Sequence, residues 1–220
     1  MVQTRPRCRA SNDCGAGRVV RLRVWQRVLN LGLLFGLTSV PACTTAQLTG
    51  TSPVQLVVVS LEGGPANSEA SFKHVLRSDV ATNGLVVEDE GRVLLALALK
   101  DPGTADLPSR PTPANFVTVT RYRVRYVRAD GRSTPGVDVP YAFDGGMTFT
   151  VGPDGGVSRF VLVRAQAKRE APLAALRNDG GAIALSTLAE VTFLGRDQAG
   201  HDVAVTGLIG VNFADWPDGD

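Results

Sequence analysis

The stretch "HDVAVTGLIGVNF", residues 201–213, alternates apolar and polar side chains along its length. Its apolar face would carry Val203, Val205, Ile209, Val211 and Phe213. Its polar face would carry Asp202, Thr206 and Asn212. A period of two is typical of a strand with one buried face and one wet face, which antiparallel sheets tolerate. The stretch therefore predicts a half-buried β-strand, with Gly207 and Gly210 marking bends or bulges.

The preceding segments extend this pattern through the rest of the chain. Residues 196–202, "RDQAGHD", supply an Asp and a Gly suited to a tight hairpin turn, and they join the stretch to a strand at 182–193. Further strands are expected at 54–61, 72–76, 92–100, 118–128, 138–143, 147–151 and 157–165. Residues 101–115 hold four prolines and predict an exposed loop, and 169–178 predict one short helix with Leu173 and Leu176 facing the core. Short strands joined by Gly/Pro turns predict an all-β antiparallel fold of about eight strands.

The hairpin "FLGRDQAGHDVAV" (193–205) resembles the last hairpin of bacterial immunoglobulin-like and fibronectin-type modules. A short helical turn before the penultimate strand also suits those modules. The resemblance covers residues 91–213 and implies an immunoglobulin-like β-sandwich. The chain departs from the antibody pattern because it has no cysteine pair in this region and no tryptophan in a middle strand.

The N-terminal segment has the order of a secretory signal. The basic stretch 18–27 precedes the apolar stretch 28–40, which is shorter than the ~20 residues needed to span a bilayer. "VPAC" (40–43) then resembles the bacterial lipobox, with Val40 as the aliphatic residue, Ala42 as the small residue and Cys43 as the lipidated new N-terminus. The alternative is that Cys43 is an ordinary buried thiol after another kind of signal.

These features predict a signal peptide over 1–42, a lipidated cysteine with a flexible tether over 43–53, and a β-sandwich over 54–220. Residues 1–17 are either an over-long translation start or a long basic region. In familiar Gram-negative lipoproteins an aspartate after the cysteine retains the protein at the inner membrane. Thr44 stands there, which favours the outer membrane of the cell envelope.

Charge and cysteine content narrow the classes of partner. Seven of the 23 basic residues but one of the 21 acidic residues precede Cys43, so the remainder has 16 basic and 20 acidic residues and a net charge of −4. This balance gives no general attraction for nucleic acid, and we expect no nucleic-acid partner. Because no cysteine follows Cys43, the body has no internal disulfide and no thiolate metal site.

Candidate catalytic residues are few. The histidines are His74 and His201, and the common hydrolase, metalloprotease and nucleotide-binding motifs are missing from the sequence. We expect His74 to be a hydrogen-bonded core or edge residue and His201 to be a solvated turn residue. The sequence predicts no enzyme, no cofactor and no metal site, although a histidine-based enzyme stays as an alternative.

Three arginines at a spacing of two form the sharpest cluster: Arg121, Arg123 and Arg125. They would project from one face of one strand, where guanidinium groups suit carboxylates, phosphates or acidic glycans. The simpler interpretation is a wet strand face paired with acids of a neighbouring strand, such as Glu190. The leading hypothesis is a membrane-tethered structural or protein-interaction module with an envelope partner. The alternative is a module that binds an acidic ligand or polysaccharide through these arginines.

Overall fold

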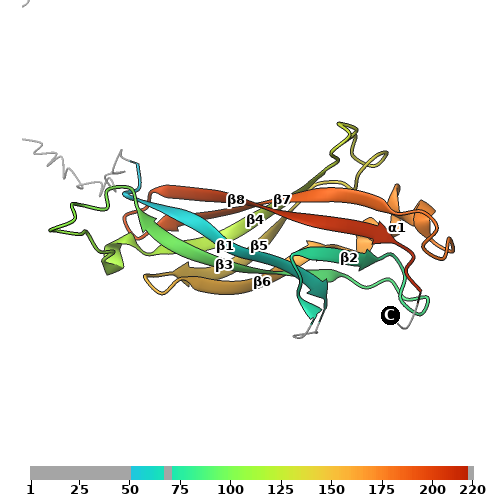
Figure 1. Cartoon of the computed structure of the whole chain (residues 1–220), viewed down its shortest axis with the longest axis horizontal. Coiled ribbons are helices and arrows are strands. Elements are labelled where there is room, and N and C mark those ends of the chain that lie inside the picture. Colours follow the sequence, from blue (N-terminus) through green and yellow to red (C-terminus); the bar gives the residue numbers. More distant parts are fainter. Residues whose placement is uncertain (1–50, 67–70, 218–220) are drawn as a thin grey trace, which may run out of the picture. The chain divides into compact units, whose positions relative to one another are not determined.

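A computed structural model describes residues 51–66 and 71–217, so the predicted signal peptide and the lipidation site lie outside the described residues. Two β-sheets form the body (Figure 1). The three-stranded sheet has the order β1 (Val54–Pro65), β3 (Asp89–Leu99), β6 (Gly156–Val163). The five-stranded sheet has the order β2 (Val75–Asp79), β8 (Asp202–Ala214), β7 (Leu185–Asp197), β4 (Val117–Val127), β5 (Phe143–Val151). The helical segments are η2 (Pro113–Asn115), α1 (Ala165–Arg169) and η3 (Leu173–Leu176).

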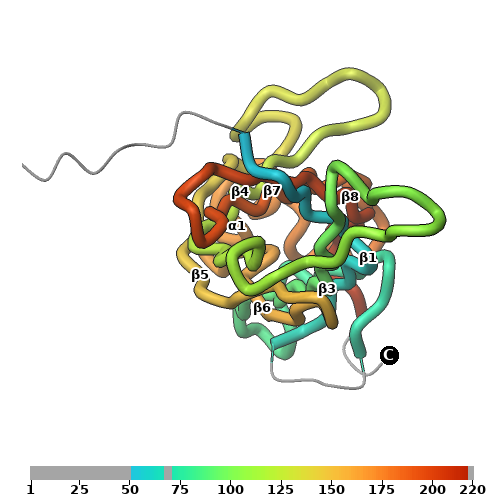
Figure 2. The backbone as a smooth tube through the Cα atoms, turned by 90° about the vertical axis from the view of Figure 1, so that its left-hand side faces the viewer, coloured from blue at the N-terminus to red at the C-terminus, as the bar shows by residue number. Residues whose placement is uncertain are grey.

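The two sheets pack face to face as a sandwich (Figure 2). Their inner side chains form one hydrophobic core. Every strand pair is antiparallel except β2, which runs parallel to β8. The period-two pattern of 201–213 is confirmed, since Val203, Ile209, Val211 and Phe213 are buried. The predicted all-β sandwich of eight strands is therefore the observed architecture.

Glycine and β-bulges adjust the packing of the two sheets. Gly207 produces no bulge, because the β7–β8 register is continuous from Leu185 to Asp202. Instead, a Cβ at Gly207 would press on the side chains of Leu61 and Val58 in β1, so the glycine lets the sheets approach. The bulges lie in β1 between Val58 and Ser60, in β4 between Val119 and Arg121, and in the β3–β6 pair beside Asp89 and Glu90. Each bulge inserts one residue and so resets which side chains face the core.

The sandwich has two ends that differ in character. At the proximal end, where β1 begins, the backbone N–H of Lys100 donates to Pro53 O, and the β7–β8 hairpin pairs with the start of β4. The exposed loop 101–115 extends from this end, as predicted. At the distal end lie the termini of β1, β2 and β8 and the segment containing α1 and η3 (Figure 1).

Several predicted elements need correction. Residues 138–143 are not a strand; they close a long loop, and β5 begins at Phe143 and includes the strand predicted at 147–151. The single helix expected at 169–178 is instead two short helical segments, although Leu173 and Leu176 are buried as expected. The short strand expected at 72–76 begins at Val75, and Ile183 lies before β7 and is exposed.

Candidate functional site

The arginine row lies on the outer face of β4. The alternation is confirmed, because Tyr122, Val124 and Tyr126 are buried on the opposite face. Arg123 forms a two-point hydrogen-bonded pair with Asp144 of β5, at 2.9 and 2.8 Å. Arg125 Nη2 lies 2.6 Å from Glu190 Oε2 of β7, the neighbour that the sequence suggested. Arg121 has no ion-pair partner within the described part of the chain.

The two histidines occupy the reverse of their expected environments. His74 is solvent-exposed, with 77% of its side chain accessible, and its Nε2 lies 3.9 Å from Glu62 Oε1. The ring of His201 is largely covered, and its Nδ1 lies 2.9 Å from Asp197 Oδ2. Asp197 also accepts bonds from the backbone N–H groups of Ala199 and His201, which fixes the hairpin turn. His201 is thus a structural turn residue at the proximal end.

A charged cluster lies buried at the distal end of the sandwich. The Lys168 side chain is fully buried, and its Nζ lies 2.9 Å from Asp89 Oδ2. The hydroxyl of Ser78, also fully buried, donates to the same carboxylate oxygen at 2.6 Å. Burial raises the pKa of Asp89, and the Lys168 charge and the Ser78 hydrogen bond oppose that rise. The cluster joins α1, β2 and β3. Because the side chains of Ser78 and Lys168 have no access to solvent, neither can reach a substrate as a nucleophile.

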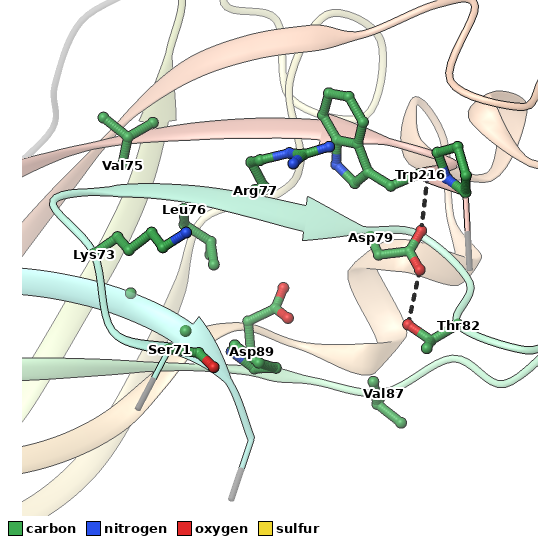
Figure 3. Close-up of a pocket in the computed structure, with 14 residues that line it drawn as sticks. Ser71, Lys73, Val75, Leu76, Arg77, Asp79, Thr82, Val87, Asp89 and Trp216 are labelled. Carbon is green, nitrogen blue, oxygen red and sulfur yellow. Dashed lines mark hydrogen bonds between the residues drawn. The ribbon is translucent and has the colours of Figure 1, made fainter. Parts of the chain in front are cut away.

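A cavity of about 450 Å³ opens beside this cluster (Figure 3). Its walls come from the end of β1, from β2 and from the C-terminal segment after β8. Asp89 lies on one side of the β2 ribbon in this view, and Arg77 with Trp216 lies on the other side. Two exposed cations line the cavity, Lys73 and Arg77, and the side chains of both lack a carboxylate partner among the described residues.

Arg77 and Trp216 lie in contact with each other in the wall of this cavity. The guanidinium carbon of Arg77 lies 4.2 Å from the centroid of the Trp216 ring, a cation–π contact. The indole Nε1 of Trp216 is buried and has no hydrogen-bond partner in the described structure. Asp79 holds the segment in place by accepting from the Trp216 backbone N–H at 3.1 Å and from the Thr82 hydroxyl at 2.8 Å.

Neither a metal centre nor a transmembrane helix emerges from the described residues. Over 51–66 and 71–217, no three His, Cys, Asp or Glu side chains gather as metal ligands would. Within the same ranges, the helices are too short and too polar to cross a bilayer. Cys43, Val40 and Ala42 fall outside these ranges.

Comparisons of the chain with protein-family models, with curated proteins and with solved structures found no match. The site therefore has to be interpreted from its own geometry.

The sequence did not predict the distal cavity. Lys168 stands in "RAQAKREA", which has the composition of an exposed helix, and Ser78 and Asp89 carry no motif. Trp216 stands in no recognisable motif either. One signal was present: two basic residues, Lys73 and Arg77, stand four positions apart in and before a short strand.

Proposed function

We propose that this chain is a lipid-anchored protein of the bacterial cell envelope, whose immunoglobulin-like sandwich is a non-catalytic interaction module. The observation that carries the proposal is the lipobox-like "VPAC" (40–43), followed after only ten residues by the first strand of a disulfide-free β body. Acyl chains on Cys43 would give stable membrane attachment, because two or more chains hold a protein where one is marginal.

The arrangement of the strands supports the immunoglobulin-like part of the proposal. In such modules the last two strands share a sheet with a middle strand, and the first strands form the opposite sheet. Here β8, β7 and β4 are neighbours, with β5 added at the edge, and β1, β3 and β6 face them. The helical segments α1 and η3 precede the penultimate strand, where the sequence resemblance expects a helical turn.

The geometry of the two ends supports an interaction role. Residues 44–53 reach at most about 35 Å when fully extended, so a lipidated Cys43 keeps the proximal end near the membrane. The distal end carries the cavity beside Lys73 and Arg77, which offers a surface for a partner. Two pairs of buried titratable groups, Asp89–Lys168 and Asp197–His201, are engaged in structural contacts.

The test of the anchor is chemical. The full chain is produced in a Gram-negative bacterium with radiolabelled palmitate, and the purified protein is weighed intact. We expect label and a mass for a chain that begins at acylated Cys43. Cys43→Ser should abolish both, whereas Cys8→Ser and Cys14→Ser should change neither. An unmodified thiol at Cys43 in the wild-type protein would contradict the proposal.

The second candidate is an acidic-ligand module that uses Arg121, Arg123 and Arg125. Arg121 favours it, because its guanidinium has no carboxylate partner in the described residues and lines a shallow surface hollow with Arg196 and Asp202. The triple reversal to glutamate is compared with wild type for binding to immobilised heparin, polygalacturonate and phosphorylated dextran. Unchanged retention on all three would eliminate this candidate.

A further inference from the structure

The free edge of β2 is the feature on which this inference rests. The N–H of Val80 donates to Ala214 O of β8 at 3.0 Å, so the backbone N–H and C=O groups of Val80 point toward β8. Because these directions alternate along a strand, Leu76 and Ser78 direct their backbone groups at β8. Val75, Arg77 and Asp79 therefore direct their N–H and C=O groups to the other side. Among the described residues these groups have no backbone partner.

The start of this edge is already paired. Gly63 of β1 and Lys73 exchange two backbone hydrogen bonds, of 2.8 and 2.9 Å. Beyond this bridge β1 and β2 separate, and the cavity of about 450 Å³ fills the seam between them. An extended segment placed in the seam would pair with the free backbone groups of Val75, Arg77 and Asp79 along β2. Unpaired strand edges are templates for such additions.

The other sheet edges fit this role less well. β1 is interrupted by its bulge after Val58, and bulges blunt an edge against pairing. A two-residue turn between Gly152 and Gly155 joins the edge strands β5 and β6, which holds their seam together. The free edge of β2 adjoins the distal cavity.

The chemistry of the seam indicates the composition of the added strand. Its two exposed cations, Lys73 and Arg77, lack carboxylate partners among the described residues, whereas Asp79 and Asp89 are already engaged. Leu76 and Val87 supply apolar wall. The side chains of the added strand would alternate between its two faces. Acidic residues on one face would contact Lys73 and Arg77, and apolar residues on the other face would contact Leu76 and Val87.

We propose that the distal seam binds an extended peptide segment of alternating apolar and acidic residues, which adds to β2 as a sixth strand of the larger sheet. The inference rests on the proposed function, because it names the class of partner for that interaction module. It does not depend on the anchor itself.

The test uses fluorescence from the seam. The chain has two tryptophans, so the full chain with Trp25→Phe, purified in detergent, retains Trp216 as its reporter. The probe is a seven-residue, end-blocked peptide of alternating valine and glutamate. We expect a saturable change in emission, weakened at least tenfold by Arg77→Glu or Lys73→Glu. Arg110→Glu, a reversal of an exposed arginine in the loop 101–115, is the matched control and should change affinity less than twofold.

Main-chain pairing is tested separately with N-methylated peptides. Methylation of the nitrogens that face β2 should abolish binding, whereas methylation of the alternate set should be tolerated. No saturable change, equal tolerance of both methylated peptides, or equal weakening by Arg110→Glu would overturn the proposal. Sedimentation that shows β2-dependent dimers excluding the peptide would also overturn it, in favour of a second copy as occupant.

Intact mass of the same sample separates the two proposals. Protein acylated at Cys43 that fails to bind the peptide rejects strand addition and leaves the anchor standing. Unmodified protein that binds the peptide rejects the anchor and leaves strand addition standing.

Discussion

The Tyr126 hydroxyl donates a hydrogen bond of 2.6 Å to the backbone oxygen of Leu162, and so joins β4 of one sheet to β6 of the other. Four residues earlier, the Tyr122 hydroxyl accepts the N–H of Val161 at 3.2 Å. Both rings are buried, and burial raises the pKa of Tyr126 well above its usual range, so its hydroxyl stays protonated as a donor. A body without disulfides thus ties its two sheets together through polar atoms within the core.

Removal of the Tyr126 hydroxyl is expected to weaken this connection. Tyr126→Phe leaves the ring in place but removes the donor to Leu162 O inside the core. Leaving a buried acceptor without its donor costs about 1–3 kcal/mol. We therefore expect the free energy of unfolding, measured in urea, to fall by that amount. Tyr141→Phe is the control, because Tyr141 is half exposed. Equal stability of the two variants would show that the 2.6 Å contact contributes nothing.

The buried Asp89–Lys168 pair should respond asymmetrically to mutation. Lys168→Met leaves a buried carboxylate without its counter-charge and should lower the free energy of unfolding by about 3–5 kcal/mol. Adding Asp89→Leu to Lys168→Met should recover much of that loss, because it removes the uncompensated charge. A double-mutant cycle measures the coupling, with the exposed Lys100→Met as control. Additive effects of the two single substitutions would contradict a direct pairing.

Two adjacent glycines of β5 provide a matched steric test. A Cβ at Gly145 would run into the ring of Tyr122, whereas a Cβ at Gly146 would meet open space. Gly145→Ala should therefore lower the thermal midpoint by several degrees, since a shift of the Tyr122 ring would disturb its bond with Val161. Gly146→Ala should leave the midpoint unchanged or raise it slightly, because alanine suits a strand better than glycine. The reverse order of midpoints would show that the ring is not held in this position.

Asp197 should make the stability of the sandwich depend on acid pH. Burial alone would favour its protonated form, but hydrogen bonds from His201 and Ser52 outweigh that effect and lower its pKa below 3.8. The unfolded chain then holds this proton more tightly than the native protein does. The stabilisation from Asp197 is complete above pH 3.8 and is lost as the pH falls through the native pKa.

Asp197→Asn tests this dependence. At pH 7 the variant should be less stable than wild type, and the difference should shrink steadily below pH 4. Denaturant midpoints at several pH values measure it, and Asp202→Asn controls for loss of an exposed carboxylate in the same hairpin. A stability difference that stays constant down to pH 2 would refute the role assigned to ionised Asp197.

The amino-acid pattern by itself determined the fold class. Alternation such as that of Val203 to Phe213, and turn residues such as Gly200, act over a few neighbouring residues, so they can be recognised without knowledge of the partners. The same local logic placed the β4 arginines on a wet face and suggested Glu190 as a neighbour. It failed at residues 138–143, where tertiary contacts hold apolar residues such as Val139 in a loop.

Only the tertiary structure decided where the distal site lies and which charges are buried. Lys168, Ser78 and Asp89 come from three separate elements, and no local pattern distinguishes a lysine that enters the core from one that stays in water. The free edge of β2 likewise depends on the chain crossing from one sheet to the other between β1 and β2. Strand order and register depend on contacts between residues far apart in sequence, whereas period-two alternation depends only on near neighbours.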